Sequence, residues 1–230
     1  MSFDDNKVIG EYTRNMSQCY AVVTTNTHLY SIAKNANPNT YMITNGIDLD
    51  KWKPAKNRIF DVNQPLIGFI GNIASPSKRD YKGYDYVVEA CNQLGLNMTE
   101  RLYGVNQLPH EEMIKKFWNK IDIFILPTKG EGCSNSIMEA LACGVPVITT
   151  REAGYHGEFC QEGTNILFCK RSVEGVKIAI EQFMKNPWLF YRLSMMGREF
   201  AIKHHNIKKI AGMYRDLFVQ CKNNLNQREE

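Results

Sequence analysis

The chain alternates short apolar runs with longer segments that mix apolar and polar residues. Three runs, at residues 66–71 (LIGFIG), 121–127 (IDIFILP) and 145–150 (VPVITT), are mainly apolar, and Asp122 is the one charged residue among them. Continuous apolar runs of this length are typical of parallel strands that are buried on both faces. We therefore predict a parallel sheet in this part of the chain.

The segments between these runs predict helices. Residues 86–94 are amphipathic, and residues 109–120 (PHEEMIKKFWNK) begin with proline and carboxylates and carry lysines later, as the helix dipole favours. Residues 100–105 (ERLYGV) predict another strand. Strands that alternate with helices indicate an α/β fold, a Rossmann-like parallel sheet covered by helices on both faces.

The segment at residues 130–148 (GEGCSNSIMEALACGVPVI) carries the most specific signal. It predicts a loop, a short helix and a strand, with Ser134 as the N-cap candidate and with Gly144 and Pro146 ending the helix. The first N–H groups of this helix have no partners within it, and they lie at the carboxyl end of a strand, where open α/β sheets bind ligands. This arrangement predicts an anion site that suits a phosphate.

Two glutamates eight positions apart, Glu131 and Glu139, lie in the loop and in the helix. The neighbours of Glu139 are apolar, and a buried carboxylate needs a partner, which a diol such as a ribose could provide. Glu131 lies at the mouth of the loop, where a group beyond the phosphates would be. On spacing alone, an exposed or ion-paired Glu139 and an ordinary strand-to-helix turn explain these residues equally well.

These residues closely resemble the E-x7-E signature of retaining GT-B glycosyltransferases, the family-four group that transfers sugars from nucleotide-sugars to glycans, lipids and small molecules. The usual string is close to EGFGLPxLEAMACGxPVI, and SNS stands here in place of GLP. The resemblance implies that the helix N-terminus binds the donor diphosphate and that Glu139 holds the ribose. It implies that Glu131 is the catalytic residue, which orients the transferred sugar or stabilises charge at its anomeric carbon. It also implies front-side attack with retention, and no required metal or cofactor.

The resemblance also covers the cations of the donor site. In the family, a glycine–arginine pair follows a strand and a lysine–glycine pair opens a helix, and both cations neutralise the diphosphate. Lys82 matches the lysine, although by composition alone it would be a solvated loop residue, whereas Asn72 replaces the arginine. Lys78 or Arg79 are candidates to substitute for that arginine. The donor-binding residues implied by the resemblance are Gly71, Asn72, Arg79, Lys82, Gly104, Val105, Gly132, Cys133, Ser134, Asn135, Ser136 and Glu139.

The resemblance extends over about residues 40–220. Residues 154–158 (GYHGE) occupy the place of the family's glycine pair and glutamate, residues 163–168 that of a short strand, and residues 192–218 that of its closing helices. A strand and a helix that usually precede residues 109–120 in the family are missing, which shortens the base-binding side.

The N-terminal part predicts a strand at residues 20–25, a helix at 27–34 and a strand at 41–44, before a family-like turn (NGID). In a full GT-B enzyme such a piece ends the first domain, which carries much of the acceptor site. The resulting division is 1–50 as a remnant or end of the N-terminal acceptor-side domain, 51–64 as linker, 65–203 as the donor-binding domain and 204–230 as a C-terminal helix. We expect either a fragment of a longer protein or a minimal form that borrows an acceptor surface.

Composition narrows the remaining possibilities. The 230 residues lack an apolar run long enough to span a bilayer, and the start is polar, unlike a signal peptide. Seven cysteines without a C-x-x-C pair favour reduced thiols in a cytoplasmic protein. A net charge of +4 gives no indication of nucleic-acid binding. The basic C-terminal stretch is consistent with peripheral membrane contact at most.

No histidine has metal-ligand spacing. We interpret His204 and His205 as residues of a solvated helix face, and His156 as the one histidine near the inferred site.

The sequence thus predicts a glycosyltransferase that moves a sugar from a UDP-, GDP- or ADP-sugar to a carbohydrate or other hydroxyl acceptor, with retention. The alternative is a non-catalytic nucleotide-sugar-binding subunit of a split transferase, completed by a partner chain that supplies an acceptor domain. An unrelated Rossmann-type nucleotide-binding protein is disfavoured, because neither a G-x-G-x-x-G nor a G-x-x-x-x-G-K-[ST] motif occurs.

Overall fold

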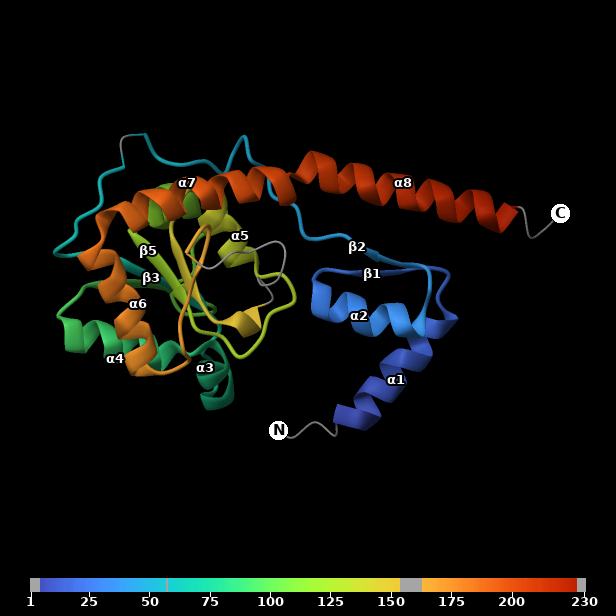
Figure 1. The fold of residues 1–230 in the computed structure, drawn as a ribbon, viewed down its shortest axis with the longest axis horizontal. Helices are drawn as coiled ribbons and strands as arrows, with labels where there is room; N and C mark the ends of the chain where they lie inside the picture. Colours follow the sequence, from blue (N-terminus) through green and yellow to red (C-terminus); the bar gives the residue numbers. More distant parts are fainter. Residues whose placement is uncertain (1–4, 57, 154–162, 227–230) are drawn as a thin grey trace. The chain divides into compact units, whose positions relative to one another are not determined.

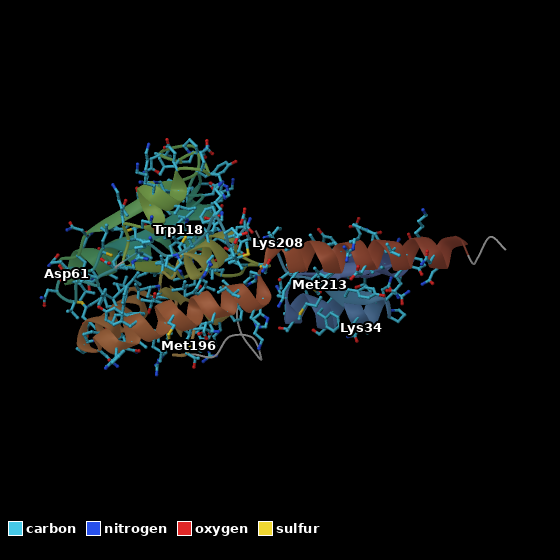
Figure 2. All side chains as sticks on the ribbon, turned by 90° about the horizontal axis from the view of Figure 1, so that it is seen from above. Lys34, Asp61, Trp118, Met196, Lys208 and Met213 are labelled. Carbon is cyan, nitrogen blue, oxygen red and sulfur yellow. The ribbon has the colours of Figure 1, made fainter. Side chains whose placement is uncertain are left out.

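The computed structural model describes residues 5–56, 58–153 and 163–226 (Figure 1). The chain divides into two compact units, one of residues 47–206 and one that combines residues 1–46 with residues 207–230. Figure 2 shows Trp118 inside the larger unit, and Lys34 and Met213 on two helices of the smaller one. Each unit has its own hydrophobic core.

The larger unit is built on a five-stranded sheet in the order β4-β3-β5-β6-β7. All neighbouring strands are parallel, and Ile67 of β3 lies opposite Met98 of β4 and Ile123 of β5. The α/β fold with a parallel sheet is therefore confirmed. The strand bounds are β3 Ile67–Gly71, β4 Met98–Leu102, β5 Ile123–Leu126, β6 Val147–Thr149 and β7 Leu167–Phe168.

Helices cover both sides of the sheet (Figure 1). Helix α4 packs against α6, and α5 packs against α7. Because helices cover both faces, every residue of β5 is at most 1% exposed, which accounts for its continuous apolar run. The helix bounds are α3 Pro76–Lys82, α4 Tyr84–Leu94, α5 Asn135–Ala142, α6 Val173–Lys185 and α7 Pro187–His204.

Asp122, the charged residue in the apolar run before β5, joins two strands. Its carboxylate accepts a hydrogen bond from the N–H of Leu66 at 2.8 Å, and its own N–H donates to the Leu66 carbonyl at 2.7 Å. Burial raises the pKa of Asp122. The polar interruption therefore pairs the start of β3 with the start of β5.

The helix predicted at residues 109–120 is wrong in extent and type. The structure has a single π-helical turn at Ile114–Trp118, in which the N–H of Asn119 donates to the carbonyl of Ile114 at 2.9 Å. This wider turn carries the consecutive aromatic residues Phe117 and Trp118, both fully buried. The core takes up both aromatic residues, and an amphipathic surface helix would bury them less completely.

Strand β4 also ends earlier than predicted. It stops at Leu102, whose N–H donates to the side chain of Asn106 at 2.6 Å, and Gly104 has a φ of 77°. The chain therefore turns where we expected the strand to continue. The side chain of Asn106, and not a neighbouring strand, accepts the hydrogen bond from the Leu102 N–H.

The smaller unit contains the predicted strand–helix–strand. Strands β1 (Val22–Thr24) and β2 (Thr40–Met42) pair in parallel, and α2 (Thr27–Ala36) connects them. The side chain of Asn26 caps α2 by accepting from the N–H of Leu29 at 2.8 Å. Helix α8 (Ile207–Asn226) contributes Ile210 and Leu217 to the small core, and α1 (Asp5–Gln18) was not predicted.

Candidate functional site

A pocket of about 510 Å³ opens at the carboxyl ends of β3, β4 and β5. Four of its lining residues, which lie at strand ends and in loops, are site residues implied by the family resemblance, namely Gly71, Asn72, Lys82 and Glu131. Three more, Ser134, Asn135 and Ser136, belong to the start of α5. The fold thus brings together residues that are up to 65 positions apart, from 71 to 136, at the edge where open parallel sheets bind ligands.

Lys82 and Glu131, which both line this pocket, form an ion pair between Nζ and Oε1. The side chains are 25% and 16% exposed, so the pair is only partly screened by solvent. The hydroxyl of Thr128 lies 3.3 Å from the same carboxylate oxygen. A cation beside a carboxylate suits a ligand that carries a phosphate next to a neutral, hydroxyl-rich group.

The position of Lys82 depends on the glycine that follows it. Gly83 has a φ of 70°, and a Cβ added there would lie 2.4 Å from the carbonyl oxygen of Pro127, just after β5. Any side chain would therefore push the end of α3 away from the end of β5. The close approach holds Lys82 within reach of Glu131.

The start of α5 lines one edge of the pocket through Ser134, Asn135 and Ser136. Ser134 occupies the predicted N-cap position, but its hydroxyl does not cap the helix and lies 3.1 Å from the hydroxyl of Ser136. The Ser134 carbonyl accepts from the N–H of Met138 at 3.1 Å, which closes the first turn. The helix therefore presents hydroxyls and the positive end of its dipole to a ligand.

Glu139 lies one turn further along α5 and is shielded from solvent. Its side chain is 14% exposed, the indole N–H of Trp118 donates to Oε2 at 3.1 Å, and His110 Nε2 lies 3.4 Å from Oε1. Burial raises the pKa of this carboxyl, while His110 and Trp118 favour the charged form. Glu139 does not line the 510 Å³ pocket. Met113, which lies five residues before the Trp118 that contacts Glu139, does line it.

Arg79 lies elsewhere in the structure. It pairs with Asp85 at 2.5 Å, and its guanidinium lies 4.6 Å from the centre of the Tyr84 ring. It does not line the pocket, and neither do Gly104, Val105, Gly132 and Cys133. Gly104 and Val105 form the exposed turn after β4. The donor-binding roles of these residues stay predictions.

The pocket contains a cation that the sequence analysis did not single out. Arg101 of β4 lines it and donates to the carbonyls of Glu100 at 2.6 Å and Lys116 at 3.3 Å. Its buried Nε–H has no hydrogen-bond partner among the residues that the structure describes. An arginine in a polar strand segment is usually expected to be solvent-exposed. The pairing of β4 with β3, which the sequence does not reveal, is what brings Arg101 to the pocket.

Two further groups of predictions concern histidines and metals. His205 is 2% exposed and its ring packs 5.5 Å from that of Phe200, so its assignment to a solvated face is wrong, because α7 ends against the core. His156 and residues 154–158 lie outside the described residues. Within the described ranges, no group of three or more His, Cys, Asp or Glu is arranged to hold a metal ion. No helix in those ranges has the length and apolar character that crossing a bilayer requires.

Part of the chain matches a known protein family. Residues 98–186 match the family described as Glycosyl transferases group 1. The chain is similar to the lipopolysaccharide core biosynthesis glycosyltransferase LpsE of Rhizobium meliloti, with 31% identity over 136 residues, which cover 59% of this chain and 38% of LpsE. The chain spans between 38% and 51% of the length of the curated relatives that it matches.

Solved structures show the same architecture. Anabaena HepE in complex with UDP-glucose superposes with a TM-score of 0.77 at 14% identity, over 95% of this chain and 68% of that chain. The C-terminal domain of a glycosyl transferase group 1 family protein (LpcC) from Francisella tularensis superposes with a TM-score of 0.57 at 18% identity, over 70% of this chain and all of that domain. The solved structures confirm the α/β fold, and the curated relatives that the chain matches are glycosyltransferases.

Proposed function

We propose that this chain binds a nucleotide-sugar and takes part in the retaining transfer of its sugar to a hydroxyl acceptor. The observation that carries the proposal is the meeting of the Lys82–Glu131 ion pair with the N-terminus of α5 in one pocket at the carboxyl edge of the sheet. A diphosphate suits the helix N-terminus and the lysine, and a neutral sugar suits the carboxylate.

The diphosphate would be neutralised from two sides. Lys82 is the first cation, and we assign the second to Arg101, which lines the same pocket, rather than to Arg79, which is paired with Asp85. Two backbone carbonyls hold the guanidinium of Arg101, so it is pre-oriented before a ligand arrives. Arg101 would then supply the positive charge that the family's arginine provides and that Asn72, at the same position, lacks.

Glu139 would accept hydrogen bonds from the ribose hydroxyls. Its carboxylate is buried enough to have a raised pKa, yet Trp118 and His110 together leave lone pairs unused on its two oxygens. A ribose diol that reaches this carboxylate would supply further donors.

Glu131 would contact the transferred sugar. When the diphosphate draws Lys82 towards its own charge, the carboxylate can accept from sugar hydroxyls or stabilise positive charge at the anomeric carbon. Retention would follow from attack on the face from which the phosphate leaves, with the leaving phosphate taking the acceptor proton. Two structures of the Anabaena protein hold UDP with glucose and UDP-glucose, which favours UDP-sugars as the first donors to test, before GDP- and ADP-sugars.

A second candidate is a nucleotide-sugar-binding subunit that needs a partner chain for transfer. The observation that favours it is the two-stranded sheet of the smaller unit, because among the described residues β1 and β2 pair only with each other. Such a small sheet offers little surface for an acceptor. Acceptor and partner would then be supplied by another domain or chain.

The test measures binding and transfer separately. The purified chain is titrated with UDP-, GDP- and ADP-sugars by calorimetry, and release of nucleoside diphosphate is followed with and without candidate hydroxyl acceptors. A ligand at a hundred times its dissociation constant also stabilises the fold by about 2.7 kcal/mol, which a melting curve resolves. Binding with turnover supports the transferase, binding without turnover supports the subunit, and a folded chain that binds no nucleotide-sugar contradicts both.

A further inference from the structure

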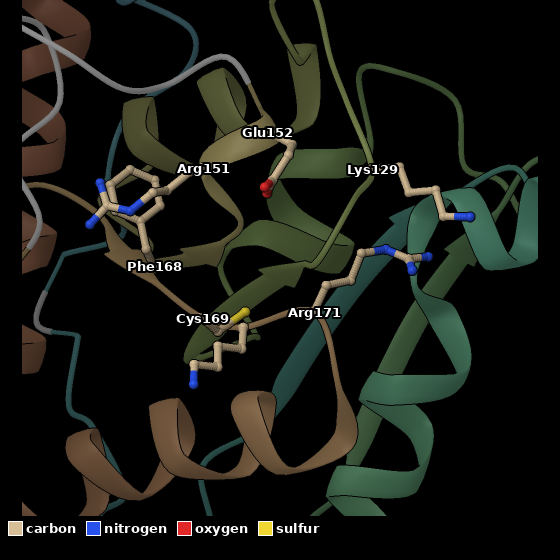
Figure 3. Close-up of a pocket in the computed structure, with 7 residues that line it drawn as sticks. Lys129, Arg151, Glu152, Phe168, Cys169 and Arg171 are labelled. Atoms are coloured by element: carbon tan, nitrogen blue, oxygen red, sulfur yellow. The ribbon is translucent and has the colours of Figure 1, made fainter.

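A second pocket, at the carboxyl ends of β5, β6 and β7, is lined mainly by cations (Figure 3). It has a volume of about 560 Å³, and four of its seven lining residues are cationic, namely Lys129, Arg151, Lys170 and Arg171. The remaining three are Glu152, Phe168 and Cys169. The cations come from the loops after three neighbouring strands, β5, β6 and β7. We call this the basic pocket.

Glu131, which lines the proposed donor pocket, is linked through its backbone to Glu152, which lines the basic pocket. The donor pocket takes its strand-end residues from β3 and β4, on one side of β5, and the basic pocket takes them from β6 and β7, on the other. The N–H of Glu131 donates to the carbonyl of Glu152 at 3.2 Å, which joins the two linings through one backbone hydrogen bond. A nucleotide in the donor pocket and a group in the basic pocket would therefore lie on opposite sides of Glu131.

The charge of the basic pocket is only partly balanced. Asp80 of α3 pairs with Lys129 at 2.6 Å and with Arg171 at 2.9 Å, and these two cations lower the pKa of its carboxyl. With Glu152 counted as well, four positive charges face two negative ones. Among the described residues the cations outnumber the carboxylates at this pocket, a composition that suits a phosphoryl group.

The cations are held by the fold. The guanidinium of Arg151 lies 4.8 Å from the centre of the Phe168 ring, and Figure 3 shows it stacked there, with Glu152 between it and Arg171. Arg171 lies 5.0 Å from the centre of the Tyr86 ring and is 19% exposed. Side chains fixed in this way lose little conformational freedom when an anion binds.

The loop that carries Lys170 is also fixed. A Cβ on Gly175 would lie 2.3 Å from the carbonyl oxygen of Lys170, so the loop packs directly on the first turn of α6. The Ser172 hydroxyl caps this helix by accepting from the N–H of Gly175 at 3.0 Å. The positive end of a 13-residue helix therefore adds to the field of the four cations.

We propose that the basic pocket binds a phosphate group carried by the acceptor. This inference rests on the proposed function, because it is the position of the nucleotide on the β3–β4 side that leaves the β6–β7 side for the acceptor. The acceptor hydroxyl would then approach the sugar at Glu131 while its phosphate is held by Arg151, Lys170 and their neighbours. Acceptors of this chemistry include soluble phosphate esters and phosphate-bearing lipids.

The test uses the whole chain saturated with UDP, so that the donor diphosphate site is filled. Binding of sn-glycerol 3-phosphate is measured by calorimetry, and binding to phosphatidylglycerol vesicles is compared with binding to phosphatidylcholine vesicles. Lys170→Gln and Arg151→Gln remove one cation each. Lys185→Gln is the matched control. Lys185 is the last residue of α6, about 20 Å along that helix from the Lys170 loop, and its side chain is 75% exposed.

We expect each pocket variant to weaken phosphate-ester binding about tenfold, the order of one charged hydrogen bond, and to leave UDP affinity unchanged. The control should match the unmodified chain. A signal with glycerol 3-phosphate indicates a soluble acceptor, and a signal with anionic vesicles alone indicates a lipid-borne phosphate. If UDP binds but neither phosphate probe does, or if the control loses as much as the variants, the basic pocket is not an acceptor site, although the proposed function stands. If the folded chain binds no nucleotide, the proposed function and this inference both fail.

Discussion

Replacing Glu139 by glutamine tests whether this buried carboxylate holds the ribose. The change keeps the size of the side chain but replaces one acceptor oxygen with an NH2 donor. Trp118 donates to Oε2, so the remaining amide oxygen is best used there, and the NH2 group then faces His110 and any ribose hydroxyls. Those hydroxyls would meet a donor in place of an acceptor.

The expected loss follows from this mismatch. A hydrogen bond to a charged group contributes about 1.5–3 kcal/mol, so nucleoside diphosphate affinity should fall by about 10-fold to 150-fold. Calorimetry on Glu139→Gln and on the unmodified chain measures the loss, and a melting curve for each establishes that both are folded.

A cycle with the ligand separates the ribose contact from indirect effects. The unmodified chain should bind 2′-deoxy-UDP more weakly than UDP, whereas Glu139→Gln should bind the two with similar affinity, because the partner of the 2′-hydroxyl is already gone. If the losses from the protein change and from the ligand change simply add, the carboxylate and the ribose do not interact, and Glu139 has a structural role at Trp118.

Four other outcomes follow from the same site. Lys82→Ala should weaken UDP binding at least about tenfold while leaving uridine binding nearly unchanged, and equal losses for both ligands would exclude a phosphate contact. Arg101→Gln should reduce UDP affinity about as much, whereas Arg79→Gln should not; the reverse ranking in calorimetry would move the second cation back to α3. Glu131→Ala should leave UDP affinity within about threefold and abolish donor hydrolysis or transfer, and retained turnover would remove Glu131 from the catalytic role. Because burial raises the pKa of Glu139 above its ordinary value of 4.5, UDP affinity should fall as pH falls through that raised pKa, and Glu139→Gln should flatten this part of the profile. Over the same interval the contribution of the Glu139 carboxyl to the stability of the unliganded chain should rise as pH falls, since the folded state binds its proton more tightly than the unfolded state does.

The parts of the fold that the sequence predicted are those with a strong local signal. Strand β5 is apolar throughout because it is buried on both faces, and Gly144 has the positive φ, 65°, expected of a residue that ends a helix. The start of α5 could be located because a buried strand, a glycine-bearing loop and an apolar helix follow one another there. Local patterns of this kind persist whatever the rest of the chain does.

The parts that could not be predicted depend on contacts between distant residues. The polar segment around Lys115 and Lys116 favours a surface helix, yet burial of Phe117 and Trp118 produced a π-helical turn. Arg101 became a pocket residue only because β4 pairs with β3 at the edge of the sheet. Tertiary packing outweighs local propensity at such places.

The cations of the basic pocket were missed for a related reason. Lys129 follows β5, Arg151 follows β6, and Lys170 and Arg171 follow β7. They share no motif, so their proximity depends on the order β5-β6-β7. Sequence spacing does not indicate which strands lie next to one another, and a set of residues that meets only through strand order leaves no periodic pattern.

In the proposed function, the ion pair between Lys82 and Glu131 would make the site selective for activated sugars. A free sugar has no anionic group with which to draw Lys82 away, so it meets a carboxylate that is already neutralised. The diphosphate of a bound nucleotide-sugar would compete with Glu131 for Lys82, and the same binding event would expose the carboxylate to the attached sugar. Simple hexoses, which are abundant in most cells, would therefore be poor inhibitors, even at concentrations far above that of the donor.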